Sequence, residues 1–308
     1  MSVQHETTLA CRFCGEALRT SFADLGETPL ANSYLNDADP DTADPRYPLH
    51  ARVCDSCFLV QVEDAVPAEE IFSDYAYFSS FSTSWVAHAE AYTRMATERF
   101  DLGPSSSVVE VASNDGYLLQ HFVKAGIPVL GIEPAANVAK TAEANGVPTM
   151  AAFFGLDLAT SLRNEGTRAD LLLGNNVLAH VPDLNDFVAG LAHLLSEDGV
   201  LTMEFPHLAR LIEDAQFDTI YHEHFSYFSL LVVENVFARH GLRLFDVEEL
   251  PTHGGSLRIF ASRSDGETRQ EGDGLAKVRR DETAMALDKI ESYAGFQTRV
   301  EAIRDGLL

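Results

Sequence analysis

The sequence has few lysines and few basic residues of any kind. Only four of its 22 basic residues are lysines, and these 22 stand against 47 acidic residues, which gives a formal net charge of −25. A surface with this excess of negative charge repels phosphate backbones. We therefore expect no nucleic-acid partner.

Long apolar runs are also missing. No stretch approaches the roughly 20 apolar residues that a membrane helix needs, and no basic region followed by an apolar one marks an export signal near the N-terminus. We expect a cytoplasmic protein with no membrane association, and nothing in the sequence implies an obligate protein partner. The 308 residues, 46% of them hydrophobic, suffice for a main domain with smaller appendages.

No cysteine follows position 57, and the four that precede it form two pairs with metal-ligand spacing. Cys11-x-x-Cys14 and Cys54-x-x-Cys57 can each direct two thiolates at one point, and together they complete a tetrahedral site. We favour zinc over iron, and a reducing compartment disfavours the alternative of disulfides. Four thiolates leave no open coordination position, so this zinc is expected to be structural.

The chain divides into three predicted regions. Residues 1–70 form the zinc-binding unit, in which the proline-rich stretch 15–53 is expected to be irregular. Residues 71–240 alternate between helical stretches and apolar strands at 107–112, 128–133, 147–152, 169–173 and 199–205. This alternation predicts an α/β fold, a parallel, doubly wound, Rossmann-like sheet that binds ligands at the carboxyl ends of its strands.

The loop after the first of these strands lacks the G-x-G-x-x-G pattern of a dinucleotide site. An acidic residue at the strand end, Glu110, followed by a turn of small residues, suits a methionine-like ammonium group. Glu133, which ends the next strand, can accept hydrogen bonds from both ribose hydroxyls. These features predict S-adenosylmethionine (SAM) as the cofactor; the alternative is a structural strand end with a chance glutamate. The predicted cofactor-binding residues are Glu110, Ala112, Ser113, Asn114, Gly116, Glu133, Asn175 and Asn176.

Polar residues after the fourth strand are expected to face the methyl group of the cofactor. These are Asn175, Asn176 and His180, although the histidine also fits a helix cap or an exposed surface. Phe153 and Phe154, after the third strand, could flank the adenine or belong to the core.

The densest polar group is Tyr221-His222-Glu223-His224, which lies among aromatic residues. Titratable groups in such surroundings have displaced pKa values, a condition that favours acid–base chemistry. A carbon methyl acceptor needs such a base, because its C–H bond must lose a proton. The alternatives are a metal site at the two histidines, which the missing H-E-x-x-H helix pattern disfavours, and a polar surface patch.

Taken together, the motifs resemble those of sugar C-methyltransferases that act on dTDP-linked 4-keto-deoxysugars in deoxysugar and antibiotic biosynthesis. The resemblance covers nearly the whole chain, and its segments are both cysteine pairs, Gly26–Asn32, Tyr75 with the serines after it, Val109–Gly116, Asn175–Pro182, Tyr221–His224 and His253–Arg258. The Ala-Ser-Asn-Asp-Gly loop followed by Tyr-His-Glu-His is highly specific.

The resemblance implies roles for the polar residues. His224 matches the base that removes the proton beside the 4-keto group, at C-3. Tyr221, Glu223, His180 and Tyr75 match the wall that positions the sugar and stabilises the enolate. The segment 73–82 lies where a lid or a substrate wall is expected; the alternative is that it forms a packed linker between the two regions. The nucleotide-linked 4-keto sugar is thus the expected substrate, with SAM and structural zinc as cofactors.

The C-terminal region departs from the family pattern. Relatives continue further into a second α/β domain, so residues 241–308 are expected to begin a C-terminal substrate-binding domain that this chain does not complete. Residues 244–250 and 257–261 are predicted to be its opening strands, and an apolar stripe over 287–307 has no evident partner. The alternatives for function are an O- or N-methyltransferase of small molecules and a non-catalytic, truncated SAM-binding relative.

Overall fold

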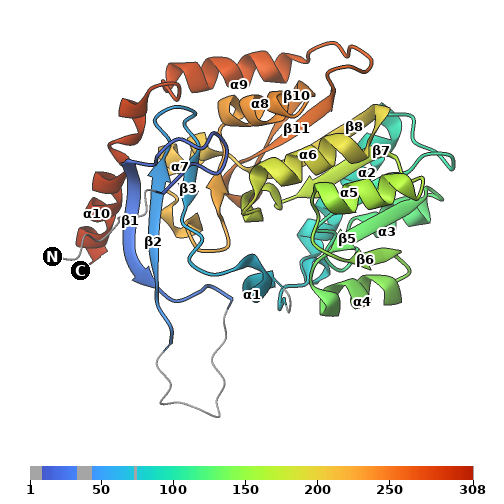
Figure 1. Cartoon of the computed structure of the whole chain (residues 1–308), viewed down its shortest axis with the longest axis horizontal. Helices are drawn as coiled ribbons and strands as arrows, with labels where there is room; N and C mark the ends of the chain where they lie inside the picture. Colours follow the sequence, from blue (N-terminus) through green and yellow to red (C-terminus); the bar gives the residue numbers. More distant parts are fainter. Residues whose placement is uncertain (1–8, 33–43, 73–74, 308) are drawn as a thin grey trace.

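The computed structural model describes residues 9–32, 44–72 and 75–307, which form two sheets with helices around them (Figure 1). The larger sheet has seven strands in the order β10-β11-β8-β7-β4-β5-β6. Five of them run parallel: β4 (Val108–Val111), β5 (Val129–Glu133), β6 (Thr149–Ala151), β7 (Ala169–Asn175) and β8 (Leu195–Pro206). They lie where the apolar runs predicted them, so the Rossmann-like sheet is confirmed. Its strand order reverses between β4 and β7, the point where such sheets bind ligands.

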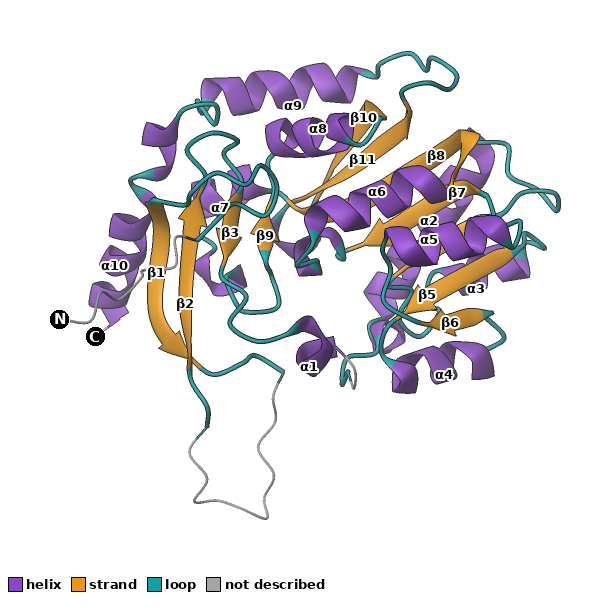
Figure 2. Cartoon of the chain, in the orientation of Figure 1, coloured by secondary structure: helices purple, strands orange, loops and turns teal. Residues whose placement is uncertain are grey.

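Helices cover both faces of this sheet (Figure 2). The hydrophobic side chains of α2 (Thr83–Arg99), α3 (Leu119–Lys124) and α4 (Ala136–Ala144) pack on one face. Those of α5 (Leu156–Asn164), α6 (Leu184–Leu194) and α8 (Leu230–Arg239) pack on the other. A polar side chain caps the start of three of these helices: Ser82, Asp183 and Ser229 each accept the N–H three residues ahead.

The two strands assigned from the sequence to a second domain instead extend the larger sheet. β10 (Leu242–Leu250) and β11 (Ser256–Arg263) form an antiparallel pair, and β11 pairs with β8. Without β11 the edge of β8 would present unpaired N–H and C=O groups. The sheet is therefore mixed, and the boundary expected at residue 241 falls within it.

The smaller sheet is antiparallel and has the order β1-β2-β3-β9. It combines β1 (Thr20–Thr28), β2 (Tyr47–Val53) and β3 (Val60–Val62) with β9 (Ser226–Tyr227) from far along the chain. The expectation of irregular chain over 15–53 is therefore wrong for its described ends. Alternate residues of β2 are buried, which gives this short segment one apolar face. The remainder of the proline-rich stretch, residues 33–43, lies outside the described residues.

The apolar stripe near the C-terminus packs against the smaller sheet. After α9 (Asp273–Ala284), a short turn of helix (Ile290–Tyr293) leads to α10 (Phe296–Leu307), which lies along β1 (Figure 1). The ring of Phe296 stacks on Phe22, with 4.4 Å between centroids, and Tyr293 is parallel to Phe58. The buried part of the stripe thus finds its partner within the chain, whereas Leu307 is exposed.

Two further short helices complete the described fold, α1 (Ala68–Phe72) and α7 (Leu208–Asp214). Within the described residues, no helix combines the length and the apolar character needed to cross a bilayer.

Candidate active site

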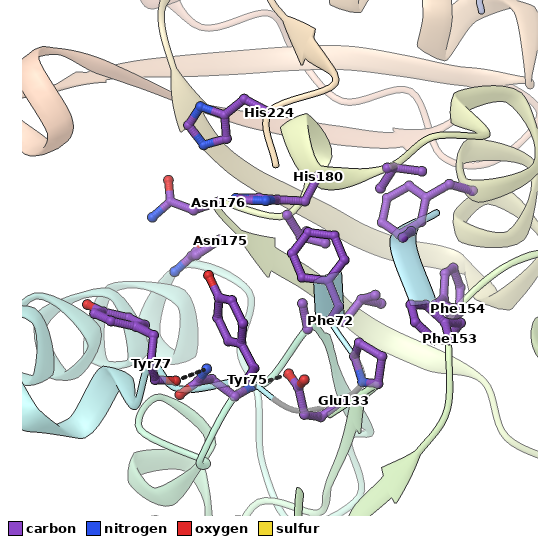
Figure 3. Close-up of a pocket in the computed structure, with 18 of the residues that line it drawn as sticks. Phe72, Tyr75, Tyr77, Glu133, Phe153, Phe154, Asn175, Asn176, His180 and His224 are labelled. Carbon is purple, nitrogen blue, oxygen red and sulfur yellow. Dashed lines mark hydrogen bonds between the residues drawn. The ribbon is translucent and has the colours of Figure 1, made fainter. Parts of the chain in front are cut away.

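A cavity of about 730 Å³ lies at the carboxyl ends of the parallel strands, beside the point where the strand order reverses. Its volume is typical of a small-molecule site. Figure 3 shows Glu133, Phe153 and Phe154 toward one end, His180 and His224 toward the other, and Asn175 and Asn176 beside the histidines. The wall therefore joins five of the eight expected cofactor residues with four of the five expected reactive residues, since Glu110, Ser113, Gly116 and Glu223 do not line it.

Glu133 lies at the end of the cavity near Phe153 and Phe154, and its orientation is fixed. Its two carboxylate oxygens accept the backbone N–H groups of Asn114 and Ala135, at 3.0 and 2.9 Å. Burial raises the pKa of this carboxyl group. Each oxygen retains a further lone pair for a ribose hydroxyl, as the sequence suggested. Phe153 and Phe154 line the cavity nearby.

Three predicted cofactor residues do not line this cavity. The side chain of Glu110 points to the face covered by α2 and α3, because it alternates with Val109 and Val111; it is fully buried, and neither carboxylate oxygen has a partner. Ser113 turns its hydroxyl toward Gly131 of the neighbouring strand. Gly116 has a φ of +78°, and a Cβ there would meet Val147, so this glycine serves the turn.

Asn114 lines the cavity, but its side chain forms hydrogen bonds with the backbone of Tyr77 and Ser79. Its Oδ1 accepts the N–H of Ser79 at 2.8 Å, and its Nδ2 donates to the carbonyl of Tyr77 at 3.1 Å. The serine-rich segment is therefore held on the cofactor loop, where Tyr75, Tyr77 and Ser79 line the cavity. Of this predicted wall, Ser73 and Asp74 lie outside the described residues.

His224 is held as a neutral imidazole. Its Nδ1 lies 3.0 Å from the carbonyl of Thr219, which can only accept, so this nitrogen carries the proton. Its Nε2 is 3.0 Å from the hydroxyl of Tyr221 and accepts from it. Burial lowers the pKa of His224 to about 4, and burial together with His224 lowers that of His180 well below its usual value. The two rings stand 4.7 Å apart, centroid to centroid.

Glu223 forms a second group beside the histidines. Its carboxylate accepts the hydroxyl of Tyr75 at 3.1 Å and Nδ2 of Asn32 at 2.6 Å. Burial raises the pKa of Tyr75, of Tyr221 and of Glu223 itself. Both tyrosines therefore remain protonated donors at neutral pH. No role had been assigned to Asn32 from the sequence, because only the fold brings it to Glu223.

The alternative of a metal bound by two histidines is not supported by their geometry. His222 points away from His224 and places Nε2 3.1 Å from the carbonyl of Pro48, with Tyr47 against its ring. In the described part of the chain, the group of side chains with metal-ligand geometry is the four cysteines.

Arg258, the last residue of the His253–Arg258 segment, directs its guanidinium to partners inside the protein. It is buried and donates to Glu204 at 2.7 Å, while His88 bonds the same carboxylate at 2.9 Å. The neighbouring Trp85 stacks on His88 and lines the cavity with His253 and Tyr117. These aromatic wall residues were missed because nothing in the sequence relates their positions.

The four cysteines come together as predicted. Their sulfur atoms all lie within 4.8 Å of one another, with Cys11 3.5 Å from Cys57 and Cys14 3.4 Å from Cys54. Four thiol ligands at this separation fit a tetrahedral zinc site. The side chain of Gln61 donates to the sulfur of Cys11 at 3.2 Å, a typical outer contact of a metal thiolate.

The chain is similar to known methyltransferases over most of its length. Family models match three regions: a zinc binding domain over residues 11–72, a methyltransferase domain over 86–247 and a C-methyltransferase C-terminal domain over 251–308. The protein "C-methyltransferase NovU" from Streptomyces niveus is 34% identical over 96% of this chain and 70% of its own length. A ubiquinone biosynthesis O-methyltransferase from Bartonella quintana is 24% identical over 30% of this chain and 38% of its own.

Solved structures also resemble part of the chain. Magnesium protoporphyrin IX methyltransferase from Synechocystis PCC 6803, with bound SAH, has a TM-score of 0.47 and 16% identity over 58% of this chain and 83% of its own. The PH0226 protein from Pyrococcus horikoshii OT3 has a TM-score of 0.49 and 14% identity over 63% of this chain and 97% of its own.

Proposed function

Because this chain belongs to the SAM-dependent C-methyltransferases that carry a zinc-binding domain, we propose that it methylates the carbon beside the keto group of a nucleotide-linked sugar. The acceptor in this proposal is a dTDP-linked 4-keto-deoxysugar, and the methylated carbon is C-3. The observation that carries the proposal is His224: a buried, neutral imidazole in the cavity that also contains Glu133. Transfer to oxygen or nitrogen would make no comparable demand for a carbon base.

In the proposed reaction, His224 removes the C-3 proton through Nε2. This nitrogen accepts from the hydroxyl of Tyr221 in the free protein. The hydroxyl of Tyr221 must therefore turn away from Nε2 and donate to another acceptor. In the proposed complex this acceptor is the keto oxygen of the bound sugar. The same movement frees the base and places a donor on the oxygen that becomes negative in the enolate.

Tyr75 completes the proposed polar wall, and Glu223, which is buried and does not itself line the cavity, lies behind it. The tyrosine donates to the carboxylate, which Asn32 also holds, so the orientation of Tyr75 is fixed before the acceptor binds. His180, beside His224, remains neutral and adds no positive charge that would discourage protonation of the base. When bound, SAM supplies an electrophilic methyl group; the wall needs only to hold the enolate carbon in line with it.

The charges of the wall suit a sugar ring. The described lining residues include carboxylates, histidines and amides but no lysine or arginine. A diphosphate normally binds to cationic groups or backbone N–H groups. We therefore place the 4-keto ring inside the cavity and the diphosphate outside its described wall.

The test is to incubate the protein with SAM and a panel of dTDP-4-keto-deoxysugars in deuterated water and to follow each sugar by mass spectrometry and NMR. A new methyl group on the carbon beside the ketone is the expected result, with deuterium uptake at the same carbon in the ketosugar that remains unmethylated. Methylation of oxygen or nitrogen would support the O- or N-methyltransferase alternative. SAM binding with no change in any sugar would support a non-catalytic role.

A further inference from the structure

Arg12 lies between the first two cysteines, and its side chain reaches from the zinc-binding unit to the reactive wall. The side chain is only 9% exposed. Its Nη1 donates to the carbonyl of Pro182 at 2.7 Å, and its Nη2 donates to the carbonyl of Val62 at 2.7 Å and to Asp64 at 2.9 Å. The guanidinium carbon also lies 5.4 Å from the ring centroid of Phe225.

These contacts join the two segments that carry the histidines. Pro182 is two residues beyond His180, and Phe225 directly follows His224. Val62, which accepts from Arg12, donates its own N–H to the carbonyl of Phe225 at 3.1 Å. One guanidinium therefore touches both segments.

The backbone of Arg12 is itself fixed by the cysteine turn. Its N–H donates to Gln61, whose amide donates to the sulfur of Cys11. The carbonyls of Arg12 and Phe13 accept hydrogen bonds from the side chain of Asn185. Asn185 lies in the first turn of α6, directly after the segment that carries His180. The metal-binding turn thus sets where the guanidinium can reach.

We propose that Arg12 is a positioning residue that couples the zinc-binding turn to the spacing of His180 and His224. This inference rests on the proposed function, because it assigns these histidines to the chemistry. A planar guanidinium can donate to two carbonyls in different directions while its face covers an aromatic ring, and a lysine ammonium cannot. The role of the zinc-binding unit therefore extends to the geometry of the site.

The experiment compares Arg12→Gln and Arg12→Lys with a matched control, Arg239→Gln. The exposed Arg239 places its guanidinium 5.6 Å from the ring of Phe13 in the same cysteine turn. It therefore tests loss of charge and of a ring contact at the turn without touching either histidine segment. Four quantities are measured: zinc per chain, SAM affinity, amide hydrogen exchange in segments 176–183 and 221–227, and kcat and KM for the sugar that the unsubstituted protein converts.

In Arg12→Gln we expect full zinc and near-normal SAM affinity, with faster exchange in both segments. We expect kcat to fall about 100-fold, the scale associated with misplacement by 1 Å, while KM changes little. Arg12→Lys should lie between this variant and the unsubstituted protein, and Arg239→Gln should match the latter. Unchanged exchange in both segments with zinc bound would overturn the inference; if Arg12→Gln does not fold, the lysine variant decides by the same criterion.

The outcomes separate this inference from the proposed function. If the unsubstituted protein converts no ketosugar while amide exchange in both segments accelerates in the Arg12 variants, the coupling of the cysteine turn to the histidine segments stands and the proposed function fails. If the unsubstituted protein is active and both Arg12 variants keep its kcat, the function stands and the positioning role fails.

Discussion

At the scale of single residues, the site depends on groups whose charge is suppressed by burial. His224 is neutral because its ring is buried and its two nitrogens have fixed partners, Thr219 and Tyr221. Tyr75 and Tyr221 keep their protons for the same reason, since burial raises their pKa values. A neutral base next to neutral donors is the combination that proton removal beside a ketone requires.

We predict that His224→Asn lowers kcat by about 10²- to 10⁴-fold, the usual contribution of a general base. SAM affinity should stay near that of the unsubstituted protein, because the predicted cofactor contacts at Glu133, Phe153 and Phe154 are not changed. Methyl transfer and calorimetric titration with SAM provide the measurements. His222→Asn is the matched control, because His222 bonds the Pro48 carbonyl away from the cavity. If His224→Asn still turns over at the normal rate, another residue is the base.

The pH dependence gives a second prediction. Burial holds the pKa of His224 near 4 in the folded protein, below the usual value of 6.5, so the imidazole stays basic down to about pH 4. The acid limb of kcat/KM assigned to this group should lie near pH 4, and NMR titration of the ring nitrogens identifies it. A ring that titrates near pH 6.5 in the folded protein would contradict the buried geometry.

The lowered pKa of His224 also makes the stability of the folded protein depend on pH. Between pH 6.5 and 4 the unfolded chain takes up a proton at His224 that the folded protein does not. The free energy of unfolding should therefore fall as the pH is lowered through this window, by up to about 3 kcal/mol from this residue. Above pH 6.5 both states are neutral at this position, and the contribution vanishes.

At the scale of elements, the decisive feature is strand pairing between segments that are distant in sequence. β9 brings residues 226–227 to the edge of β3, so the Tyr221–His224 segment is anchored on the N-terminal unit. β11 closes the edge of β8 and carries Arg258 to Glu204. α10 covers the smaller sheet from the other end of the chain through Phe296 and Phe22.

We predict that Phe296→Ala lowers the free energy of unfolding by about 3–5 kcal/mol, because it removes a buried ring and leaves a cavity against β1. The exposed Leu307→Ala, in the same helix, is the control and should change stability by less than about 0.5 kcal/mol. Denaturant unfolding of both variants is the measurement. Equal stability in the two variants would mean that α10 does not pack on the sheet in solution.

At the scale of the whole molecule, the zinc-binding unit and the SAM-binding sheet form one working structure. The reactive cavity takes Asn32 from the N-terminal unit, Glu133 from the parallel sheet and His224 from the segment that links the two sheets. Loss of zinc should therefore affect more than the region between the cysteines.

We predict that Cys14→Ser releases zinc and lowers the melting temperature, because a ligand of a structural metal contributes directly to folding free energy. Loss of zinc should also affect the site, because Arg12 in the cysteine turn contacts Val62 and Phe225. Amide exchange should therefore accelerate in segment 221–227 as well as in β1 to β3. Metal analysis, thermal melting and hydrogen exchange test this prediction. A variant that retains zinc and melts at the normal temperature would rule out a structural zinc at these cysteines.

The sequence by itself determined the features that are local. The spacing of the cysteines predicted their cluster, and the alternation of apolar strands and helices predicted the parallel sheet. Of the two acidic residues at strand ends, Glu133 lines the cavity, and its role in holding the cofactor stays a prediction. The first inference needs only the ligand spacing within each cysteine pair, and the second needs only apolar periodicity over short stretches.

Only the tertiary structure decided how distant segments meet. Asn32 reaches Glu223 across 191 positions, and Arg12 reaches Pro182 across 170. The same holds for two corrections: β10 and β11 join the main sheet, and the side chain of Glu110 points to a covered face of that sheet. These outcomes follow from the pairing of strand edges and the packing of faces, which the whole fold sets and no short stretch of sequence encodes.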